Sequence, residues 1–345
     1  MQSMTLPVAR TPDPRDAPAL RWGVLGAGGI AATMTTALQE GTRQQVVAVG
    51  SRDLGRAREF AGRFGIARAH GSYEDLVADP EVDAVYVASP HSEHHDHALL
   101  AIAAGKHVLV EKAFTRNAAE ADAVLEAADD AGVTCIEAMW SRFLPGYDVV
   151  RQAVLDGLVG DVRLVQADHG QLLYPDGPER LADPALAGGA LLDLGVYPIH
   201  LAAMLLPEVV EVTATGTLTP LGVDEQENIT LRDASGALAA LSATMSATSP
   251  TVATVAGTKA RLDLQGPFYQ PSTIRLVDPN DRTLDVWEPP TRDALLGLRY
   301  EAAELARCVA DARRESPLLP WAETRRVMAL MDEIRSQLGV VLPGE

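Results

Sequence analysis

Short apolar runs alternate with helical segments over the first 138 residues of the chain. The runs lack polar alternation, which is typical of strands buried on both faces of a parallel sheet. Ser72 with Asp75 resembles a capping box at a helix start. The expected strands are Arg21–Leu25, Gln45–Gly50, Val82–Ala88, His107–Val110 and Val133–Glu137, and the expected helices are Ala31–Glu40, Leu54–Phe64, Ser72–Ala78, His94–Ala104 and Ala118–Ala131. This order predicts a doubly wound α/β domain.

After Trp140 the pattern changes. A helix is expected at Tyr147–Leu155 and a strand at Val162–Asp168. Val/Thr/Leu runs at short spacing then predict a large, mostly antiparallel sheet. These runs are Glu211–Leu218, Glu227–Leu231, Ala237–Thr244, Thr251–Ala256 and Thr273–Val277, and two helices follow at Asp293–Asp311 and Ala322–Leu338.

The fold class predicted is therefore an N-terminal Rossmann dinucleotide-binding domain followed by an α+β domain with an open-faced sheet. The proline-rich residues 1–18 are expected to form a loose tail, followed by the Rossmann domain at 19–139. The substrate and oligomerisation domain is expected at 140–320, with a helix at 321–340 that packs back on the Rossmann domain.

The charge balance narrows the choice of partners. The chain has 29 Lys and Arg against 47 Asp and Glu, a net charge of −18. This charge repels phosphate backbones and anionic membranes, so neither nucleic acid nor a membrane is expected as a partner. Cys135 and Cys308 form no disulfide framework, and no export signal is apparent, which favours the cytoplasm.

A glycine-rich turn follows the first expected strand. Gly26, Gly28 and Ala31 match the G-x-G-x-x-G/A pattern, with Gly29 and Ile30 between the last two. The glycines permit a tight turn and a close approach of a pyrophosphate, whose charge the free N–H groups of the helix start would bind. A second strand follows about 20 residues later, as the dinucleotide motif requires.

The end of the second strand favours NADP over NAD. An acid at this place accepts the ribose 2′-hydroxyl of NAD. Here Ser51 and Arg52 come first, and a guanidinium suits a 2′-phosphate. NAD stays possible, because Arg52 could be a solvated loop residue while Asp53 takes the role of the acid.

Two further segments carry possible chemistry. The strand His107–Val110 ends in Glu111 and Lys112, at the edge where ligands of such sheets bind. Far downstream, Asp193, Tyr197 and His200 are spaced i, i+4 and i+7, so they would share one face of a helix.

With these segments the chain resembles the glucose-fructose oxidoreductase/inositol dehydrogenase (Gfo/Idh/MocA) family from about residue 20 to 338. Within it, the segments Glu137–Pro145 and Gly188–Ile199 resemble the dimeric dihydrodiol dehydrogenases and the NADP-dependent aldose dehydrogenases. The resemblance implies that Lys112 lies beside the nicotinamide and that Tyr197 is the acid/base residue. Asp193, on the same predicted helix face as Tyr197, is a further candidate catalytic residue. It further implies that Ser89, Pro90 and His91 form the loop under the cofactor ribose and nicotinamide.

Physical chemistry supports this pair independently. A phenol with a pKa of about 10 is a poor base near neutrality. A nearby ammonium group favours the phenolate and brings the pKa closer to the working pH. In the family a proline follows the lysine, whereas this chain has Ala113, which must either adopt a non-proline cis bond or shift Lys112.

Each of these residues also has a structural interpretation. Lys112 could pair with Glu111, and Tyr197 could be a core residue. Asp193 could be a helix N-cap, because Pro198 is typical of a helix start, and His200 could be a buried structural histidine. The histidines at 91, 94, 95 and 97 raise the alternative of a metal site, but no distant ligand converges on them and no metal is expected. Trp140, Arg142 and Phe143 could line a substrate cleft or brace a domain interface.

The sequence thus predicts an NADP-dependent oxidoreductase acting on a polyhydroxylated small molecule: a sugar, a sugar derivative or a cyclic diol. Two alternatives remain, a non-catalytic NADP sensor and a sugar–sugar oxidoreductase with tightly held cofactor. The outer face of the C-terminal sheet needs a cover, which predicts a homodimer or homotetramer.

Overall fold

Residues 4–345 are described by a computed structural model, in which they form two compact units. One unit comprises Pro12–Trp140 and Ala294–Met328, and the other comprises Ser141–Asp293 with Ala329–Glu345 and residues 4–11. The division differs from the one expected from the sequence at residues 294–320, which join the Rossmann unit and not the C-terminal one.

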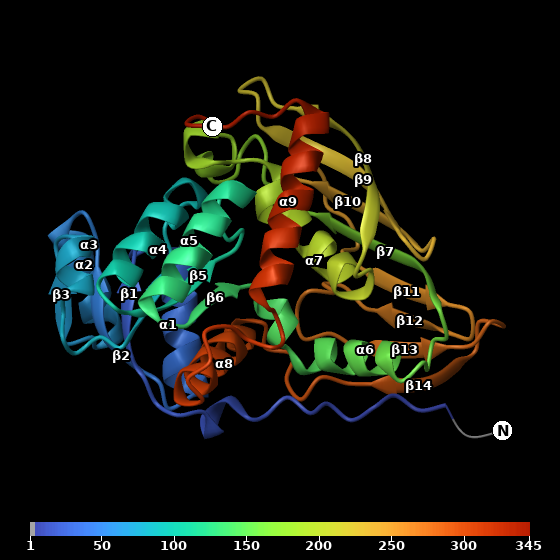
Figure 1. Ribbon diagram of the computed structural model, residues 1–345, viewed down its shortest axis with the longest axis horizontal. Helices are drawn as coiled ribbons and strands as arrows, with labels where there is room; N and C mark the ends of the chain where they lie inside the picture. Colours follow the sequence, from blue (N-terminus) through green and yellow to red (C-terminus); the bar gives the residue numbers. More distant parts are fainter. Residues whose placement is uncertain (1–3) are drawn as a thin grey trace. The chain divides into compact units, whose positions relative to one another are not determined.

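The first unit contains a six-stranded parallel sheet in the order β3-β2-β1-β4-β5-β6 (Figure 1). Its strands are β1 (Arg21–Leu25), β2 (Gln45–Gly50), β3 (Arg68–His70), β4 (Ala84–Val87), β5 (His107–Glu111) and β6 (Cys135–Ala138). Its helices are α1 (Gly29–Gly41), α2 (Leu54–Phe64), α3 (Tyr73–Val77), α4 (His94–Ala103), α5 (Ala118–Ala131) and α8 (Arg299–Ala310). The strand order reverses between β1 and β4, which is the point where ligands bind in such sheets. The predicted doubly wound domain is confirmed.

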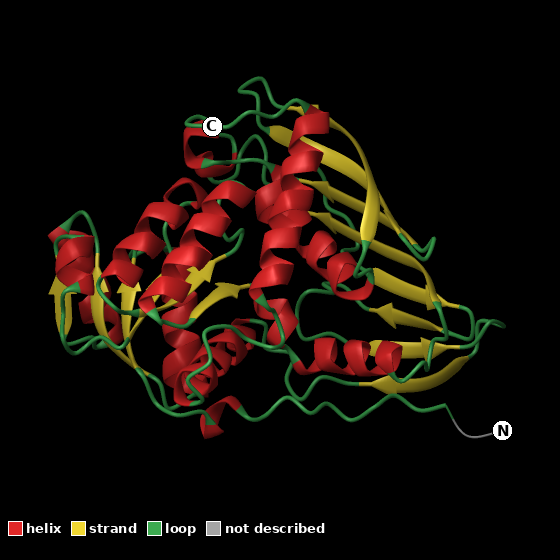
Figure 2. Cartoon of the chain, in the orientation of Figure 1, coloured by secondary structure: helices red, strands yellow, loops and turns green. Residues whose placement is uncertain are grey.

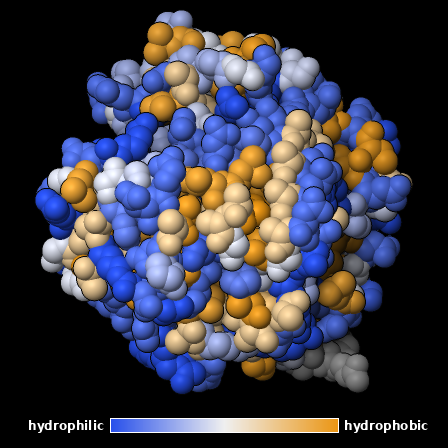
Figure 3. Space-filling view, turned by 60° about the vertical axis from the view of Figure 1, so that its left-hand side comes forward, coloured by the Kyte–Doolittle hydropathy of each residue, from blue (hydrophilic) through white to orange (hydrophobic). Residues whose placement is uncertain are grey.

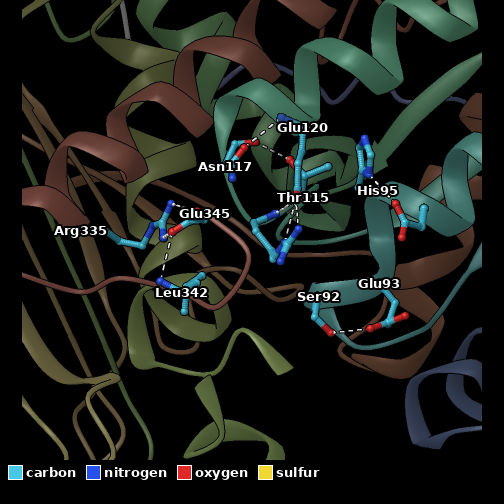
Figure 4. A network of polar contacts seen from close by, with 11 residues as sticks. Ser92, Glu93, His95, Thr115, Asn117, Glu120, Arg335, Leu342 and Glu345 are labelled. Carbon is cyan, nitrogen blue, oxygen red and sulfur yellow. Dashed lines mark hydrogen bonds and ion pairs between the residues drawn. The ribbon is translucent and has the colours of Figure 1, made fainter. Parts of the chain in front are cut away.

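Local signals in the sequence explain where several helices begin and end. The Ser72 side chain accepts a hydrogen bond from the Asp75 N–H, as the predicted cap requires. Asn117 caps α5 through the N–H of Glu120 (Figure 4). Gly132 ends α5 with a φ of 69°, in the left-handed region.

The second unit contains an eight-stranded sheet in the order β14-β13-β12-β11-β7-β10-β9-β8 (Figure 2). The strands are β7 (Val162–Gly170), β8 (Val209–Leu218), β9 (Asp224–Asp233), β10 (Leu238–Thr244), β11 (Ala253–Gly257), β12 (Arg261–Leu264), β13 (Ile274–Val277) and β14 (Thr283–Trp287). Among the described strands of this sheet, only the β7–β10 pair is parallel. The predicted, mostly antiparallel sheet is confirmed.

Three helices accompany this sheet, and one of them continues into both units. They are α6 (Pro145–Leu155), α7 (Val196–Leu205) and α9 (Trp321–Leu338). Residues 321–328 of α9 belong to the Rossmann unit, where Thr324 donates to the buried Glu137 carboxylate at 3.0 Å. Residues 329–338 belong to the C-terminal unit, where Gln337 bonds Ala214 of β8.

The apolar stretch around α7 is a core helix. Among the described residues, Pro184–Leu205 is the one helical stretch long and apolar enough to cross a membrane, and 94% of it is buried inside the protein. In the view of Figure 3, hydrophilic residues cover most of the surface and apolar residues lie between them in small groups.

The N-terminal segment differs from the expected loose tail, of which residues 1–3 lie outside the described residues. Its extended backbone is bound to the C-terminal unit: Leu6 N–H donates to Asp285 at 2.8 Å and Arg10 N–H to Asp148 at 2.6 Å. The buried Asp148 and the half-buried Asp285, by accepting backbone N–H groups, give a proline-rich segment a fixed path that its composition does not reveal.

Candidate functional site

The glycine turn joins β1 to α1 as predicted. Gly26 has a φ of 106°, and a Cβ there would lie 2.9 Å from the Ala88 carbonyl oxygen, so only glycine suits the turn. Gly28 is the N-cap of α1, and a Cβ on Gly28 or Gly29 would meet nothing within 4 Å. The α1 start has no side-chain cap and no acid in its first turn. This open, uncapped helix end fits the pyrophosphate of a dinucleotide.

At the end of β2, Asp53 is already used as a helix cap. Its side chain accepts hydrogen bonds from the N–H groups of Gly55 and Arg56 at the start of α2. Ser51 is buried next to it, and Arg52 is exposed. A carboxylate held on two backbone donors is poorly placed to serve as the ribose acid, which weakens the NAD alternative.

A second arginine joins Arg52 here, which the sequence analysis did not single out. Burial raises the pKa of the Tyr73 phenol, and the positive charges of Arg52 and Arg56 oppose that rise. The two guanidinium groups therefore lie near one side chain. The spacing of four residues, with Asp53 as the cap between them, was the available signal for Arg56.

The backbone around Lys112 is held from several sides. The Lys112 N–H donates to the Glu111 carboxylate at 3.1 Å, and Glu111 also accepts from the Tyr86 hydroxyl. His91 Nε2 lies 3.2 Å from the Lys112 carbonyl oxygen, and His94 Nδ1 lies 2.8 Å from that of Ala113. The Lys112–Ala113 peptide is cis, so the first of the two expected outcomes for the missing proline is the one observed.

The histidines of this region form hydrogen bonds with the surrounding loop and do not converge on a common metal site. His94 Nε2 lies 2.9 Å from the Ser89 carbonyl oxygen, and burial lowers the pKa of His94 to about 4, so the ring is neutral at pH 7 and donates to one carbonyl at a time. His97 pairs with the Ser89 hydroxyl, and His95 with Asp96 (Figure 4). Within residues 4–345, no group of three or more His, Cys, Asp or Glu could hold a metal ion.

Trp140, Arg142 and Phe143 form one short 3-10 turn, and each is less than a tenth exposed. The boundary between the two compact units falls within this turn, after Trp140. In the C-terminal unit, Arg142 and Tyr197 both act on the buried Tyr147: burial raises the pKa of that phenol, Arg142 lowers it and Tyr197 raises it further.

Asp193 and Tyr197 lie in one continuous helix, Ala190–Leu205, whose first part is a π-helix (Leu191–Gly195). Asp193 is inside the helix, so the N-cap interpretation is wrong: the N-cap position is Ala190. Its carboxylate pairs with Arg180 at 3.3 Å. Arg180 lies in a short 3-10 turn before the helix (Glu179–Leu181), which the sequence pattern does not predict. His200 is fully buried.

An aromatic group surrounds Tyr197. Its ring centroid lies 4.4 Å from that of Tyr269 and 5.3 Å from that of His169. Tyr197 is 7% exposed and Tyr269 is 8% exposed. The sequence analysis missed His169 and Tyr269, because neither belongs to a motif and only the sheet brings them to the helix.

Two buried acids of β9 lie beneath the π-helix. Asp224 accepts the Leu191 N–H at 2.5 Å, and burial raises its pKa to about 6. Burial, with the charge of Asp224, raises the pKa of Glu227 well above its ordinary value. A Cβ on Gly195 would lie 2.8 Å from Glu227 Oε1, so the glycine allows the helix to approach the strand this closely.

Comparison with known proteins agrees with this geometry. Residues 20–139 match the profile of the oxidoreductase family with an NAD-binding Rossmann fold, and residues 147–263 match the GFO/IDH/MocA C-terminal domain. The chain belongs to the Gfo/Idh/MocA family. The resemblance inferred from the sequence is thereby confirmed, and the chain is an NAD(P)-binding oxidoreductase.

Several relatives extend over nearly the whole chain. Trans-1,2-dihydrobenzene-1,2-diol dehydrogenase of Xenopus tropicalis is 35% identical over 334 residues, which is 94% of this chain and 100% of the relative. The Danio rerio enzyme of the same name is 37% identical over 332 residues, covering 94% of this chain and 98% of the relative.

Among solved structures, a 3-ketoreductase from Actinomadura kijaniata in complex with NADP and TDP-benzene is 27% identical, with a TM-score of 0.81 over 93% of this chain and 98% of that one. An aldose–aldose oxidoreductase from Caulobacter crescentus, complexed with glycerol, is 25% identical, with a TM-score of 0.82 over 93% and 97% of the two chains.

Proposed function

We propose that the chain transfers hydride between NADP and a carbinol or carbonyl carbon of a sugar, a sugar derivative or a cyclic diol. The observation that carries this proposal is the open, uncapped dinucleotide turn of the Rossmann unit. The C-terminal unit supports it by carrying Tyr197 and Asp193 on one helix. Dihydrodiol dehydrogenases as relatives, and a 3-ketoreductase as a structural neighbour, support the substrate class.

In this proposal Tyr197 is the acid/base residue and Lys112 assists it. A bound NADP would supply the nicotinamide carbon that exchanges hydride with the substrate carbon. As a phenolate, Tyr197 takes the proton of the substrate hydroxyl during oxidation, and as a phenol it returns that proton to the carbonyl oxygen during reduction. The Lys112 ammonium favours the phenolate and polarises a carbonyl oxygen. The 3-ketoreductase among the structural neighbours has been solved as two variants, one with a lysine replaced by alanine and one with a tyrosine replaced by phenylalanine. The choice of a lysine and a tyrosine for study in that enzyme supports the assignment of Lys112 and Tyr197.

The rest of the cofactor is assigned to the Rossmann unit. Gly26, Gly28, Gly29 and Ile30 would receive the pyrophosphate, and Ser51 with Arg52 and Arg56 the 2′-phosphate. The Ser89–His91 loop and Glu111 would lie along the ribose and nicotinamide. Trp140, Arg142 and Phe143, together with Asp193, would contact substrate, whereas the full burial of His200 favours its structural interpretation.

A screen of NADP⁺ and NAD⁺ reduction against aldoses, inositols and dihydrodiols tests the activity, with Lys112→Met and Tyr197→Phe alongside. General acid–base groups contribute roughly 10²–10⁴-fold, so we expect Tyr197→Phe to lower kcat by about a hundredfold or more. Full turnover in both variants contradicts the catalytic assignment. NADPH binding by the wild type without turnover of any substrate favours the sensor alternative.

A sugar–sugar oxidoreductase is a second candidate, favoured by the aldose–aldose oxidoreductase among the structural neighbours. Such an enzyme differs from a dehydrogenase because it keeps the cofactor bound between its two half-reactions. Gel filtration of the NADP-loaded protein separates the two: cofactor that elutes with the protein and is re-oxidised by a second sugar supports this candidate.

We further propose a cytoplasmic homodimer or homotetramer. Both cysteines are free and buried, as a reducing compartment allows. A row of uncharged residues crosses five strands on the outer face of the large sheet: Thr254, Gln166, Ala240, Thr230 and Thr213. In a chain with 22% charged residues, such a row suits contact with a second copy.

A further inference from the structure

The helix that carries Asp193 and Tyr197 is widened because of Pro198. A proline inside a helix has no N–H to donate, and its ring crowds the carbonyl four residues before it. For Pro198 that carbonyl belongs to Leu194. The Val196 N–H donates to the carbonyl of Leu191, five residues back, which is the π-helical pattern that accommodates the proline.

His169 donates a hydrogen bond to the displaced Leu194 carbonyl. It is 1% exposed and lies on the inner face of β7, where its Nδ1 is 3.0 Å from the Leu194 oxygen. Because a carbonyl can only accept, Nδ1 carries the proton. The Gln171 amide nitrogen lies 2.8 Å from Nε2 and donates to it, which fixes the neutral tautomer.

The same side chains hold the aromatic group. The Gln171 amide nitrogen also donates to the Tyr269 hydroxyl at 3.3 Å. The His169 ring lies 4.6 Å from Tyr269 and meets Tyr197 at an interplanar angle of 63°. His169 thus contacts the backbone of the π-helix and the ring of Tyr197 at once, and its own orientation is set from β7.

We propose that His169 is a positioning residue for Tyr197: its Nδ1–H holds the π-helix that Pro198 creates, and this fixes where the Tyr197 hydroxyl stands. The inference rests on the proposed role of Tyr197. An apolar ring at 169 would fill the same space but remove this donor, so that the Leu194 carbonyl would keep only its contact with the Val196 N–H. The loss of a hydrogen bond at such a buried site is costly.

Two substitutions of His169 separate the contribution of its ring from that of its Nδ1–H donor. His169→Phe keeps a ring and removes the Nδ1–H, whereas His169→Asn places an amide nitrogen near the position of Nδ1 and removes the ring. We expect His169→Phe to lower kcat by roughly tenfold, the effect of one lost buried hydrogen bond, with KM for substrate little changed. His169→Asn should recover most of that loss. His169→Phe with wild-type kcat, or His169→Asn as impaired as His169→Phe, overturns the proposal.

Hydrogen exchange gives a readout that needs no turnover. In His169→Phe, the amides of Leu191–Tyr197 should exchange faster than in the wild type, and in His169→Asn at nearly the wild-type rate. Unchanged exchange in His169→Phe contradicts the proposed hold on the helix, even if the wild type oxidises no diol or sugar and the proposed function itself fails. His95→Phe, in the Rossmann unit, is the matched control and should change neither readout.

Discussion

At the residue scale, the end of β2 shows how local structure can occupy a carboxylate that would otherwise be able to bind a ligand. Asp53 stands where an NAD enzyme would place its ribose acid, but its side chain caps α2. The charges of Arg52 and Arg56 act on Tyr73, together with that of Glu93, and these two arginines are the groups proposed to bind a 2′-phosphate. The identity of the acid was visible in the sequence, whereas its use as a cap depends on where the helix begins.

We predict that Arg52→Ala raises KM for NADP⁺ by about ten- to a hundredfold, because a charge-assisted hydrogen bond contributes roughly 1.5–3 kcal/mol. KM for NAD⁺ should change less than threefold by the same reasoning. Steady-state kinetics with both cofactors measures this. Arg56→Ala should act in the same direction, and Arg58→Ala, exposed on the same helix, serves as the control. Equal losses for both cofactors contradict a 2′-phosphate site.

At the scale of elements, the turn between β1 and α1 separates a glycine needed for folding from one needed for binding. Gly26 has a positive φ and touches the Ala88 backbone, whereas Gly28 faces open space. The two positions look alike in the motif, and only the strand that lies beside the turn distinguishes them.

Gly26→Ala is predicted to destabilise the protein by roughly 1–3 kcal/mol, the cost of a non-glycine residue in a strained conformation. Gly28→Ala should leave the free energy of unfolding nearly unchanged and weaken NADP⁺ binding, because its methyl group lies where the pyrophosphate approaches. Denaturant unfolding and cofactor titration measure the two effects. Gly62→Ala, in the exposed interior of α2, should stabilise slightly. The assignment fails if Gly28→Ala binds NADP⁺ as tightly as the wild type.

Some elements gave no usable signal in the sequence. The strands β3, β12 and β14 have three to five residues, and β3 and β14 lie at sheet edges with half-exposed patterns. Such short runs do not establish a period of two. Helix α8 was expected and is present within the predicted range, but its membership of the Rossmann unit is decided by packing that no local pattern reports.

At the scale of the whole molecule, the outer face of the large sheet is the surface that sequence and structure both leave for a partner. Strand alternation sends Gln166, Ala240 and Thr230 to this face in one register row. All three are exposed and uncharged. An unpaired face of this kind on a strongly acidic chain favours association with its own copy over association with an anionic partner.

The double variant Ala240→Lys with Thr230→Lys is predicted to dissociate the oligomer, because two charges per copy would be buried without partners. Sedimentation at micromolar concentration should then give the mass of one chain, 36.7 kDa, where the wild type gives a multiple of it. Leu155→Lys, exposed on α6 and outside this row of residues, should keep the wild-type mass. A monomeric wild type contradicts this assembly outright.

The sequence by itself determined the features that depend on neighbours along the chain: the dinucleotide turn from Gly26 to Ala31, the strand ending in Lys112, the spacing of Asp193 and Tyr197, and with them the family. The tertiary structure alone decided the rest. It made Asp53 a cap, placed Asp193 inside a π-helix, brought His94 to the Ala113 carbonyl and His169 to that of Leu194. A sequence motif indicates a backbone conformation that a few adjacent residues determine among themselves. A hydrogen bond between β7 and a helix 25 residues away depends on strand register and packing, to which no short segment contributes a recognisable pattern.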